Sequence, residues 1–446
     1  MIPFPLRRTP AEQVLDRMQE VREQDVLWRE GRVFSLVFFA GEDVLDLIKK
    51  AYALFISENG LNPAAFPSLR RFESDVVGIA ASLLGGDAKT AGTMTSGGTE
   101  SILMAVKAAR DWARVERPGI AVPEMVLPVS AHPAFHKAGH YFGVRPVVIP
   151  VAPDYRADVE VTEAVITKST ILLVGSAPAY PYGVVDPIAE LGKLAERRGL
   201  LCHVDACVGG FFLPFVRRLG YPVPEFDLSV PGVTSLSADL HKYAYSAKGA
   251  SVILYRTRAL RRYQFHVHLD WPGGIYASPS MTGTRPGGAI AAAWAVLHHL
   301  GEEGYLALAS QVMGTVSRLR EGIEAIPGLA VLGEPVGSIL AITSGAVDVY
   351  EIGVEMGLRG WRLDRQQRPP SLHMTVTPAH VQGVEPFLDD LRQATEAVAR
   401  AGPAGERCQE AVRRPAMYGI TGDLMGAGSQ KQAILDLMDR MLEPSE

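Results

Sequence analysis

Residues 235–255 read SLSADLHKYAYSAKGASVILY, and this stretch decides the fold of the surrounding chain. Its first residues predict a short buried strand, and the apolar run 250–255 predicts a second strand. Lys242 follows His241 where the first strand ends. A lysine between two core strands reaches water poorly, so its ammonium form is disfavoured and its neutral amine can attack an aldehyde. The alternative is a lysine whose charged head extends past an apolar stem into solvent.

Apolar runs alternate with helical patterns from Met125 to Tyr255. One helix is well marked, with Asp186 as the expected N-cap, Pro187 in the first turn and Gly199 as the stop. Such a chain builds an α/β sandwich with ligands at the carboxyl ends of its strands. The continuous runs, typical of buried parallel strands, are 125–129, 147–151, 171–174 and 200–204.

Three polar residues come directly after predicted strands: His132, Asp205 and Lys242. The parallel arrangement therefore predicts that they meet at one edge of the sheet. A carboxylate that ends an apolar strand needs a partner, because an unpaired buried charge is costly. For Asp205 this partner is a protonated ring nitrogen of a cofactor or, alternatively, one of the many arginines of the chain.

Residues 95–101 read TSGGTES and open the helical pattern 102–109. Free backbone N–H groups, hydroxyl donors and the positive end of the helix dipole together favour an anion, and glycine lets the backbone approach it closely. The alternative is an ordinary helix cap that contains glycine. The sequence has neither a Walker lysine nor a GxGxxG motif, so it supports no nucleotide P-loop and no dinucleotide site.

The 446 residues are 47% hydrophobic and 21% charged, which allows a full core without disulfides or metals. A net charge of -5 argues against nucleic acid as the main partner. Three scattered cysteines fit a reducing compartment. The N-terminus lacks the apolar run of a signal peptide, and the longest apolar stretch is too short to cross a bilayer. We therefore expect a cytoplasmic protein without a transmembrane segment.

The expected domain organisation has three parts: an N-terminal helical segment (1–60), a large domain (61–300) and a smaller C-terminal domain (301–446). The glycine-rich stretch 269–288 predicts a long irregular loop, and such loops are usually functional or mobile. His266 and the nearby His268 have no evident third ligand, so we expect no metal site.

An anion cradle, an aldehyde-seeking lysine and a buried carboxylate together define a pyridoxal 5'-phosphate site. The motifs that carry them resemble those of the sphingosine-1-phosphate lyases, which are fold-type-I pyridoxal phosphate enzymes related to the group II amino-acid decarboxylases. The resemblance implies a three-layer α/β/α large domain with a smaller α+β C-terminal domain. The motifs are TSGGTES (95–101), HVDACVGGFFLPF (203–215), DLHKYAYSAKGASVILY (239–255) and GGIYASPSMTGTRPGG (273–288).

The resemblance also assigns roles at the cofactor. It implies that Lys242 forms the Schiff base, that Asp205 partners the pyridine nitrogen and that His132 stacks on the ring. The residues implied to hold the phosphate are Gly97, Gly98 and Thr99, with Ser237 and His241 as helpers. The implied reaction is a retro-aldol cleavage that turns a phosphorylated long-chain 3-hydroxy-2-amino base into an aldehyde and phosphoethanolamine.

The resemblance places further residues near the substrate. Lys248 corresponds to a second lysine of the lyases and is our candidate for the base or for a phosphate contact. Tyr418 resembles a C-terminal tyrosine near the substrate. The loop with Tyr276 and Arg285 comes, by resemblance, from the other subunit, which implies a homodimer with shared active sites.

Two residues depart from the family pattern at the substrate's phosphate. Phe39 stands where the lyases carry a tyrosine, and Asn62 stands where they carry a histidine. Phe39 offers no donor, and Asn62 cannot carry positive charge. We expect these changes to weaken dianion binding by a few kcal/mol as an order of magnitude, so the substrate can differ from a sphingoid phosphate.

Two alternatives stay open at this point. An amino-acid decarboxylase needs the same cofactor groups, together with a pocket for an α-carboxylate. A catalytically silent homologue would serve in binding or assembly, but it would not need Lys242, Asp205 and His132 together.

Overall fold

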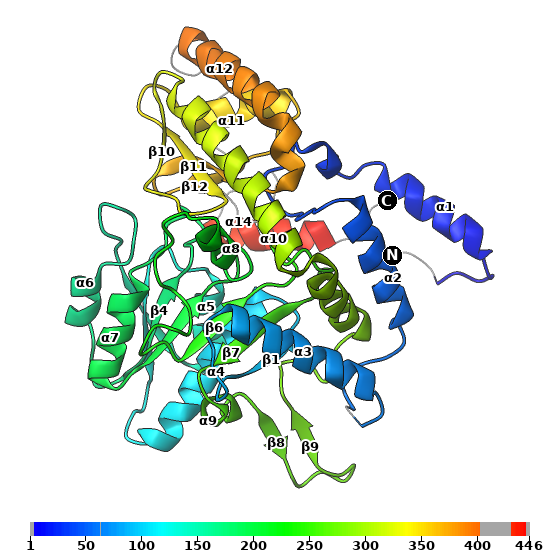
Figure 1. The fold of residues 1–446 in the computed structure, drawn as a ribbon, viewed down its shortest axis with the longest axis vertical. Coiled ribbons are helices and arrows are strands. Elements are labelled where there is room, and N and C mark those ends of the chain that lie inside the picture. Colours follow the sequence, from blue (N-terminus) through cyan, green and yellow to red (C-terminus); the bar gives the residue numbers. More distant parts are fainter. Residues whose placement is uncertain (1–3, 63, 402–429, 443–446) are drawn as a thin grey trace.

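A seven-stranded sheet organises the part of the chain that the computed structural model describes, residues 4–62, 64–401 and 430–442 (Figure 1). Its strand order is β1-β7-β6-β5-β4-β2-β3, and only β7 runs antiparallel to its neighbours. The strands are β1 (Ala91–Thr95), β2 (Glu124–Pro128), β3 (Arg145–Ile149), β4 (Thr170–Ser176), β5 (Leu201–Asp205), β6 (Ser235–Ala238) and β7 (Ser251–Tyr255).

Helices cover both faces of this sheet because its strands are apolar on both sides. Met125 and Leu127 of β2 pack in a cluster with residues of α4 and α5, whereas Val126 packs in another cluster with residues of α3 and α7. The three-layer α/β/α architecture is thus confirmed. The helices of this part are α2 (Glu42–Leu54), α3 (Pro67–Leu83), α4 (Gly98–Glu116), α5 (Ala134–Phe142), α6 (Val159–Ala164), α7 (Ile188–Arg198), α8 (Leu213–Arg218) and α9 (Arg258–Arg262).

The smaller α+β unit contains an antiparallel sheet of order β10-β11-β13-β12. Helix α10 (Gly287–Glu324) leads into it and is interrupted at Gly301, whose φ of 53° and ψ of -171° are not helical. This break lies at the expected boundary near residue 300, although the division into domains stays a prediction. The other elements are β10 (Leu329–Val331), β11 (Ile339–Ser344), α11 (Val349–Leu358), β12 (Asp364–Gln367), β13 (Pro370–Thr375), η2 (Pro378–Gly383), α12 (Val384–Ala401) and, further along the chain, α14 (Gln430–Leu442).

The N-terminal segment contacts this smaller unit. After α1 (Ala11–Arg22) and η1 (Trp28–Glu30), Val33 forms a parallel bridge with Arg362. The buried Phe34 stacks on His380 with ring centroids 4.2 Å apart. Segments far apart in sequence therefore meet beside the sheet.

The carboxyl ends of most central strands lie at one edge of the sheet. Since β1 and β6 are each antiparallel to β7, they run in the same direction as β2, β4 and β5. The segments that follow these strands therefore meet, as expected for this fold.

One local prediction was wrong. Asp186 does not cap α7, because its carboxylate is fully buried and accepts the backbone N–H groups of Ala157 and Ser176, both at 2.8 Å. Burial raises the pKa of Asp186 to about 6. The carboxylate joins β4 to the 154–157 turn, and Gly199 ends α7 with a φ of 61°, as expected.

A two-stranded hairpin of β8 (His266–His268) and β9 (Tyr276–Ser278) projects from the body (Figure 1). Several large apolar side chains on it are exposed, among them Leu269, Trp271 and Ile275. Among the described residues, no helix combines the length and apolarity needed to cross a membrane.

Candidate active site

A cavity of about 320 Å³ opens at the carboxyl edge of the central sheet. Its walls come from the segments that follow β1, β2, β4, β5 and β6, so residues distant in sequence converge there. We call it the cofactor cavity. It is lined by Ser96, Gly97, Gly98, Thr99, Glu100, Ile102, His132, Ser176, Pro178, Tyr180, Asp205, Cys207, Val208, Asp239, His241 and Lys242.

The glycine pair at the start of α4 forms a tight cradle. A Cβ atom on Gly98 would lie 2.7 Å from Sγ of Cys207 and 2.9 Å from both carboxylate oxygens of Asp239. A Cβ atom on Gly97 would lie 3.3 Å from the ring of His241. Only glycine keeps this space open, and the helix N-terminus provides free N–H groups there.

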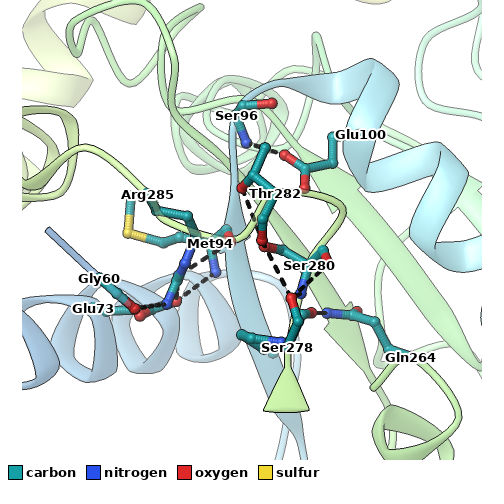
Figure 2. A network of polar contacts seen from close by, with 12 residues as sticks. Gly60, Glu73, Met94, Ser96, Glu100, Gln264, Ser278, Ser280, Thr282 and Arg285 are labelled. Carbon is teal, nitrogen blue, oxygen red and sulfur yellow. Dashed lines mark hydrogen bonds and ion pairs between the residues drawn. The ribbon is translucent and has the colours of Figure 1, made fainter. Parts of the chain in front are cut away.

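Glu100 in the first turn of α4 fixes the rim of the cradle. It accepts the N–H of Ser96 at 2.6 Å (Figure 2) and the N–H of Met281 at 2.9 Å. The loop that follows β9 is thereby held against the start of α4.

Lys242 lies in the turn after β6, and its ammonium group has a carboxylate partner. Its Nζ is 2.9 Å from Oδ2 of Asp239, and Nε2 of His241 is 3.6 Å from the same oxygen. Burial raises the pKa of Asp239, but Lys242 and His241 outweigh this effect and hold it below its ordinary value. The expectation of a neutral, desolvated lysine is therefore opposed by Asp239, which stabilises the ammonium form.

Asp205 ends β5 and is held by neighbouring donors. Its Oδ1 accepts the N–H of Cys207 at 3.1 Å and the hydroxyl of Ser237 at 3.4 Å. The Ser237 hydroxyl also lies 3.3 Å from Nε2 of His203, whose Nδ1 is 2.9 Å from the hydroxyl of Ser235. This chain of side chains fixes the direction of the carboxylate.

Ser237 thus contacts Asp205 and does not line the cavity, so its assignment to the phosphate has no geometric support in the described residues.

His132 follows β2 and lines the cofactor cavity. Burial lowers its pKa, although the nearby charge of Asp205 acts in the opposite direction. Its Nδ1 accepts the N–H of Ala134 at 3.1 Å, which fixes the ring and places the proton on Nε2. The ring is thus held in one orientation at the cavity wall.

Lys248 is near the charges of Lys242 and Asp239, but it does not line the cofactor cavity. Its Nζ donates to the carbonyl of Leu36 at 2.9 Å and lies 5.3 Å from the ring centre of Phe38. Burial, with a contribution from the charge of Lys242, lowers the pKa of Lys248 to about 8. Leu36 itself has a φ of 69°, an unusual value for a residue with a side chain.

The residues expected near the substrate do not line the cavity within one chain. Phe39 packs edge-on against Trp28, and Asn62 accepts the N–H groups of Ala64 and Ala65 at the surface. Tyr276 is on the exposed side of β9. Tyr418 lies outside the described residues.

Arg285 is held by acidic and backbone groups. Its guanidinium pairs with Glu73 of α3 and donates to the carbonyls of Met94 and Gly60, both at 3.5 Å (Figure 2). In the single chain this arginine fastens the end of the 269–288 loop to the body.

The cavity fits pyridoxal 5'-phosphate. The cradle at Gly98 has room that a Cβ atom would fill, and Oδ1 of the fully buried Asp239 has no hydrogen-bond partner within the described part of the chain. An amine, a carboxylate and a cradle at a helix N-terminus match the cofactor's aldehyde, ring nitrogen and phosphate.

Sequence reasoning did not single out Asp239, Cys207 or Tyr180 as cavity residues. For Asp239 the available signal was a carboxylate three residues before the lysine.

Comparison with known proteins places the chain in a family. Residues 5–336 match the model of the pyridoxal-dependent decarboxylase conserved domain. The chain is 43% identical to the sphingosine-1-phosphate lyase of Arabidopsis thaliana over 436 residues, which are 96% of this chain and 79% of that protein. The chain belongs to the sphingosine-1-phosphate lyase family.

A solved lyase structure supports this placement, and the chain is also similar to a decarboxylase. The structure of the sphingosine-1-phosphate lyase of Burkholderia pseudomallei superposes with a TM-score of 0.89 at 38% identity, covering 99% of this chain and 97% of that chain. The probable L-aspartate decarboxylase of Pyrococcus furiosus is 33% identical over 358 residues, 80% of this chain and 94% of that protein. The predicted resemblance is thereby confirmed, and with it the dependence on pyridoxal phosphate.

Proposed function

We propose that the protein is a pyridoxal phosphate-dependent carbon–carbon lyase. It cleaves a phosphorylated long-chain 3-hydroxy-2-amino base between C2 and C3, giving a fatty aldehyde and phosphoethanolamine. The observation that carries this proposal is the convergence of Lys242, Asp205 and His132 on one cavity beside the Gly97–Gly98 cradle. Membership of the lyase family supports the choice of reaction.

When bound, the cofactor supplies an aldehyde and a ring that accepts the electrons of the broken bond. Lys242 would hold the aldehyde carbon, and Asp205 would keep a proton on the ring nitrogen. His132 would lie against the ring face. The phosphate would take the cradle of Gly97, Gly98 and Thr99, with His241 beside it.

Two lysines, Lys248 and Lys242, would transfer protons to and from the substrate. Lys248 takes the proton of the 3-hydroxyl group at Nζ, for which a pKa of about 8 is well matched to neutral conditions. Lys242 would be the group that returns a proton to C2, the carbon that keeps the amino group. The family resemblance assigns Tyr418, which lies outside the described residues, to the substrate end of the site. Phe39 and Asn62 would offer the phosphate fewer donors than the family pattern provides.

We further propose a homodimer with shared active sites. The support is the exposed apolar surface of the β8–β9 hairpin, where Leu269 and Ile275 are 70% and 74% exposed. Such a surface marks an interaction site. The partner's copy of this loop would bring Tyr276 and Arg285 toward the active site, which explains why they do not reach the cavity within one chain.

We also propose a cytoplasmic location. Cys202 and Cys207 are buried as free thiols, and thiols persist in reducing compartments.

A two-assay experiment tests the function. The cofactor-loaded protein is incubated with sphingoid phosphates while aldehyde is measured, and with amino acids while carbon dioxide is measured. Aldehyde release supports the lyase. Carbon dioxide without aldehyde would replace it with the decarboxylase, and a protein that acquires no visible cofactor absorbance would contradict both.

A further inference from the structure

A second cavity of about 530 Å³ adjoins the cofactor cavity. It lies between the loops that follow β2, β3 and β4 on one side and the β12–β13 hairpin of the smaller unit on the other. We call it the side chamber. Its volume is typical of small-molecule sites, which occur preferentially between such units.

The side chamber and the cofactor cavity share two wall residues, His132 and Tyr180. The ring of Tyr180 stacks on His373 of β13 with centroids 4.1 Å apart, and its hydroxyl donates to Asp364 of β12 at 3.5 Å. The smaller unit therefore holds Tyr180, one of the two shared wall residues, in place.

Most of the chamber's interior is apolar. The residues that line it on the large-domain side include Val129, Ala131, Pro133, Pro150, Val151 and Pro181. Charged groups come from the β12–β13 side, where Arg365 and the exposed Arg368 lie. Asp364 is the acidic residue among the residues that line the chamber, and burial raises its pKa. An apolar interior of this size suits a hydrocarbon chain better than a small polar amino acid.

The residues assigned to the substrate's phosphate do not line this chamber. Phe39 and Asn62, the two positions that the family pattern places at the phosphate, are absent from its walls. The chamber is therefore available to the alkyl end of the substrate.

We propose that the side chamber binds the alkyl chain of the substrate, the part that leaves as the aldehyde. This inference rests on the proposed lyase function and adds to it a binding site for one half of the substrate. The chain enters past His132 and Tyr180 and lies along Val129 and Val151.

Two valines at opposite ends of β2 provide the test. Val129 follows the strand, is 50% exposed and lines the chamber, whereas Val122 precedes the strand, is 56% exposed and lines neither cavity. Val129→Trp introduces a large side chain at the wall of the chamber, and Val122→Trp is the matched control. Each variant is assayed with a long-chain and a short-chain homologue of the same phosphorylated base.

We expect Val129→Trp to raise KM for the long-chain substrate about tenfold and to change kcat/KM for the short-chain substrate by less than about twofold. Val122→Trp should change neither. An equal loss on both substrates, or no loss on either, would place the alkyl chain elsewhere. Val151→Trp repeats the measurement at a second chamber position, should Val129→Trp fold poorly.

A binding measurement separates this inference from the proposed function. If the parent protein releases no aldehyde from either homologue, the lyase function fails. Calorimetric binding of the long-chain alcohol that corresponds to the aldehyde then decides the chamber. Binding that weakens about tenfold in Val129→Trp and persists in Val122→Trp supports the chamber, and binding that is absent or equal in both variants overturns it.

Discussion

Nζ of Lys242 lies 2.9 Å from Oδ2 of Asp239, and both groups line the cavity that fits the cofactor. The Asp239 side chain is only 2% exposed, so this ion pair is little screened by water. The carboxylate favours the charged form of the amine and holds it beside the glycine cradle.

Replacing Lys242 with alanine should abolish turnover, because no other described amine lines the cavity. We expect kcat to fall by ~10³-fold or more, with loss of the visible absorbance of the loaded protein. Lys137→Ala removes an exposed lysine of α5 and should leave both unchanged. A Lys242→Ala protein that turns substrate over at the parent's rate would refute the assignment.

Replacing Asp239 with asparagine should make the Lys242 amine easier to deprotonate, since its counter-ion is gone. The rate of cofactor uptake, followed by visible absorbance as a function of pH, should then reach half its maximum at least about one pH unit lower. Asp46→Asn removes a fully exposed carboxylate that pairs with Lys49 and should not shift the profile. An unshifted profile in Asp239→Asn would show that the ion pair does not control the amine.

The role of Lys248 can be read from the pH dependence of kcat/KM, which reports the free enzyme. Burial lowers its pKa to about 8, so the neutral base is lost as the pH falls below that value. If Lys248 is the base, kcat/KM rises about tenfold per pH unit up to about pH 8 and then levels.

Two variants check this prediction. Lys248→Met should remove the rising limb together with most of the activity, while Lys248→Arg, which stays charged, should be equally inactive. Activity that instead falls as the pH rises through 8, and that Lys248→Arg retains, would assign Lys248 to the phosphate as a cation.

The cradle at the start of α4 predicts a strict requirement for glycine. An alanine at position 98 would place its Cβ 2.7 Å from Sγ of the buried Cys207. We expect Gly98→Ala to weaken cofactor binding by at least about tenfold, measured by titration of the visible absorbance. Gly78→Ala, in α3 with nothing within 4 Å of the new Cβ, should bind normally. Normal binding by Gly98→Ala would show that the phosphate lies elsewhere.

The sheet could be predicted from the sequence because buried parallel strands read as continuous apolar runs. The run 125–129 corresponds to β2 (Glu124–Pro128). Ligands bind at the carboxyl ends of parallel strands, and this rule correctly predicted that His132, Asp205 and Lys242 lie at one site. The strand order could not be predicted, because crossovers such as the step from β1 to β7 leave no local pattern.

The parts of the site that sequence reasoning missed have one local and one long-range cause. Asp239 comes only three residues before Lys242, but the sequence pattern does not show that the turn after β6 brings the two side chains together. Tyr180 becomes a wall of two cavities only through His373 and Asp364 of the smaller unit. Asp186 looked like a helix cap because its position suits one, and its burial against two backbone N–H groups is a tertiary effect.

The exposed hairpin yields the last prediction, on assembly. Trp271 is 55% exposed between Leu269 and Ile275 on the projecting β8–β9 hairpin, so a partner subunit would bury it. We expect Trp271→Asp to convert the proposed dimer to a monomer in sedimentation, because an unpaired charge in an apolar interface is costly. It should also lower kcat/KM, since Tyr276 and Arg285 would no longer reach the neighbouring site. Leu358→Asp, at a residue 78% exposed at the end of α11, should leave the dimer intact. A parent protein that sediments as a monomer and is fully active would contradict the shared site.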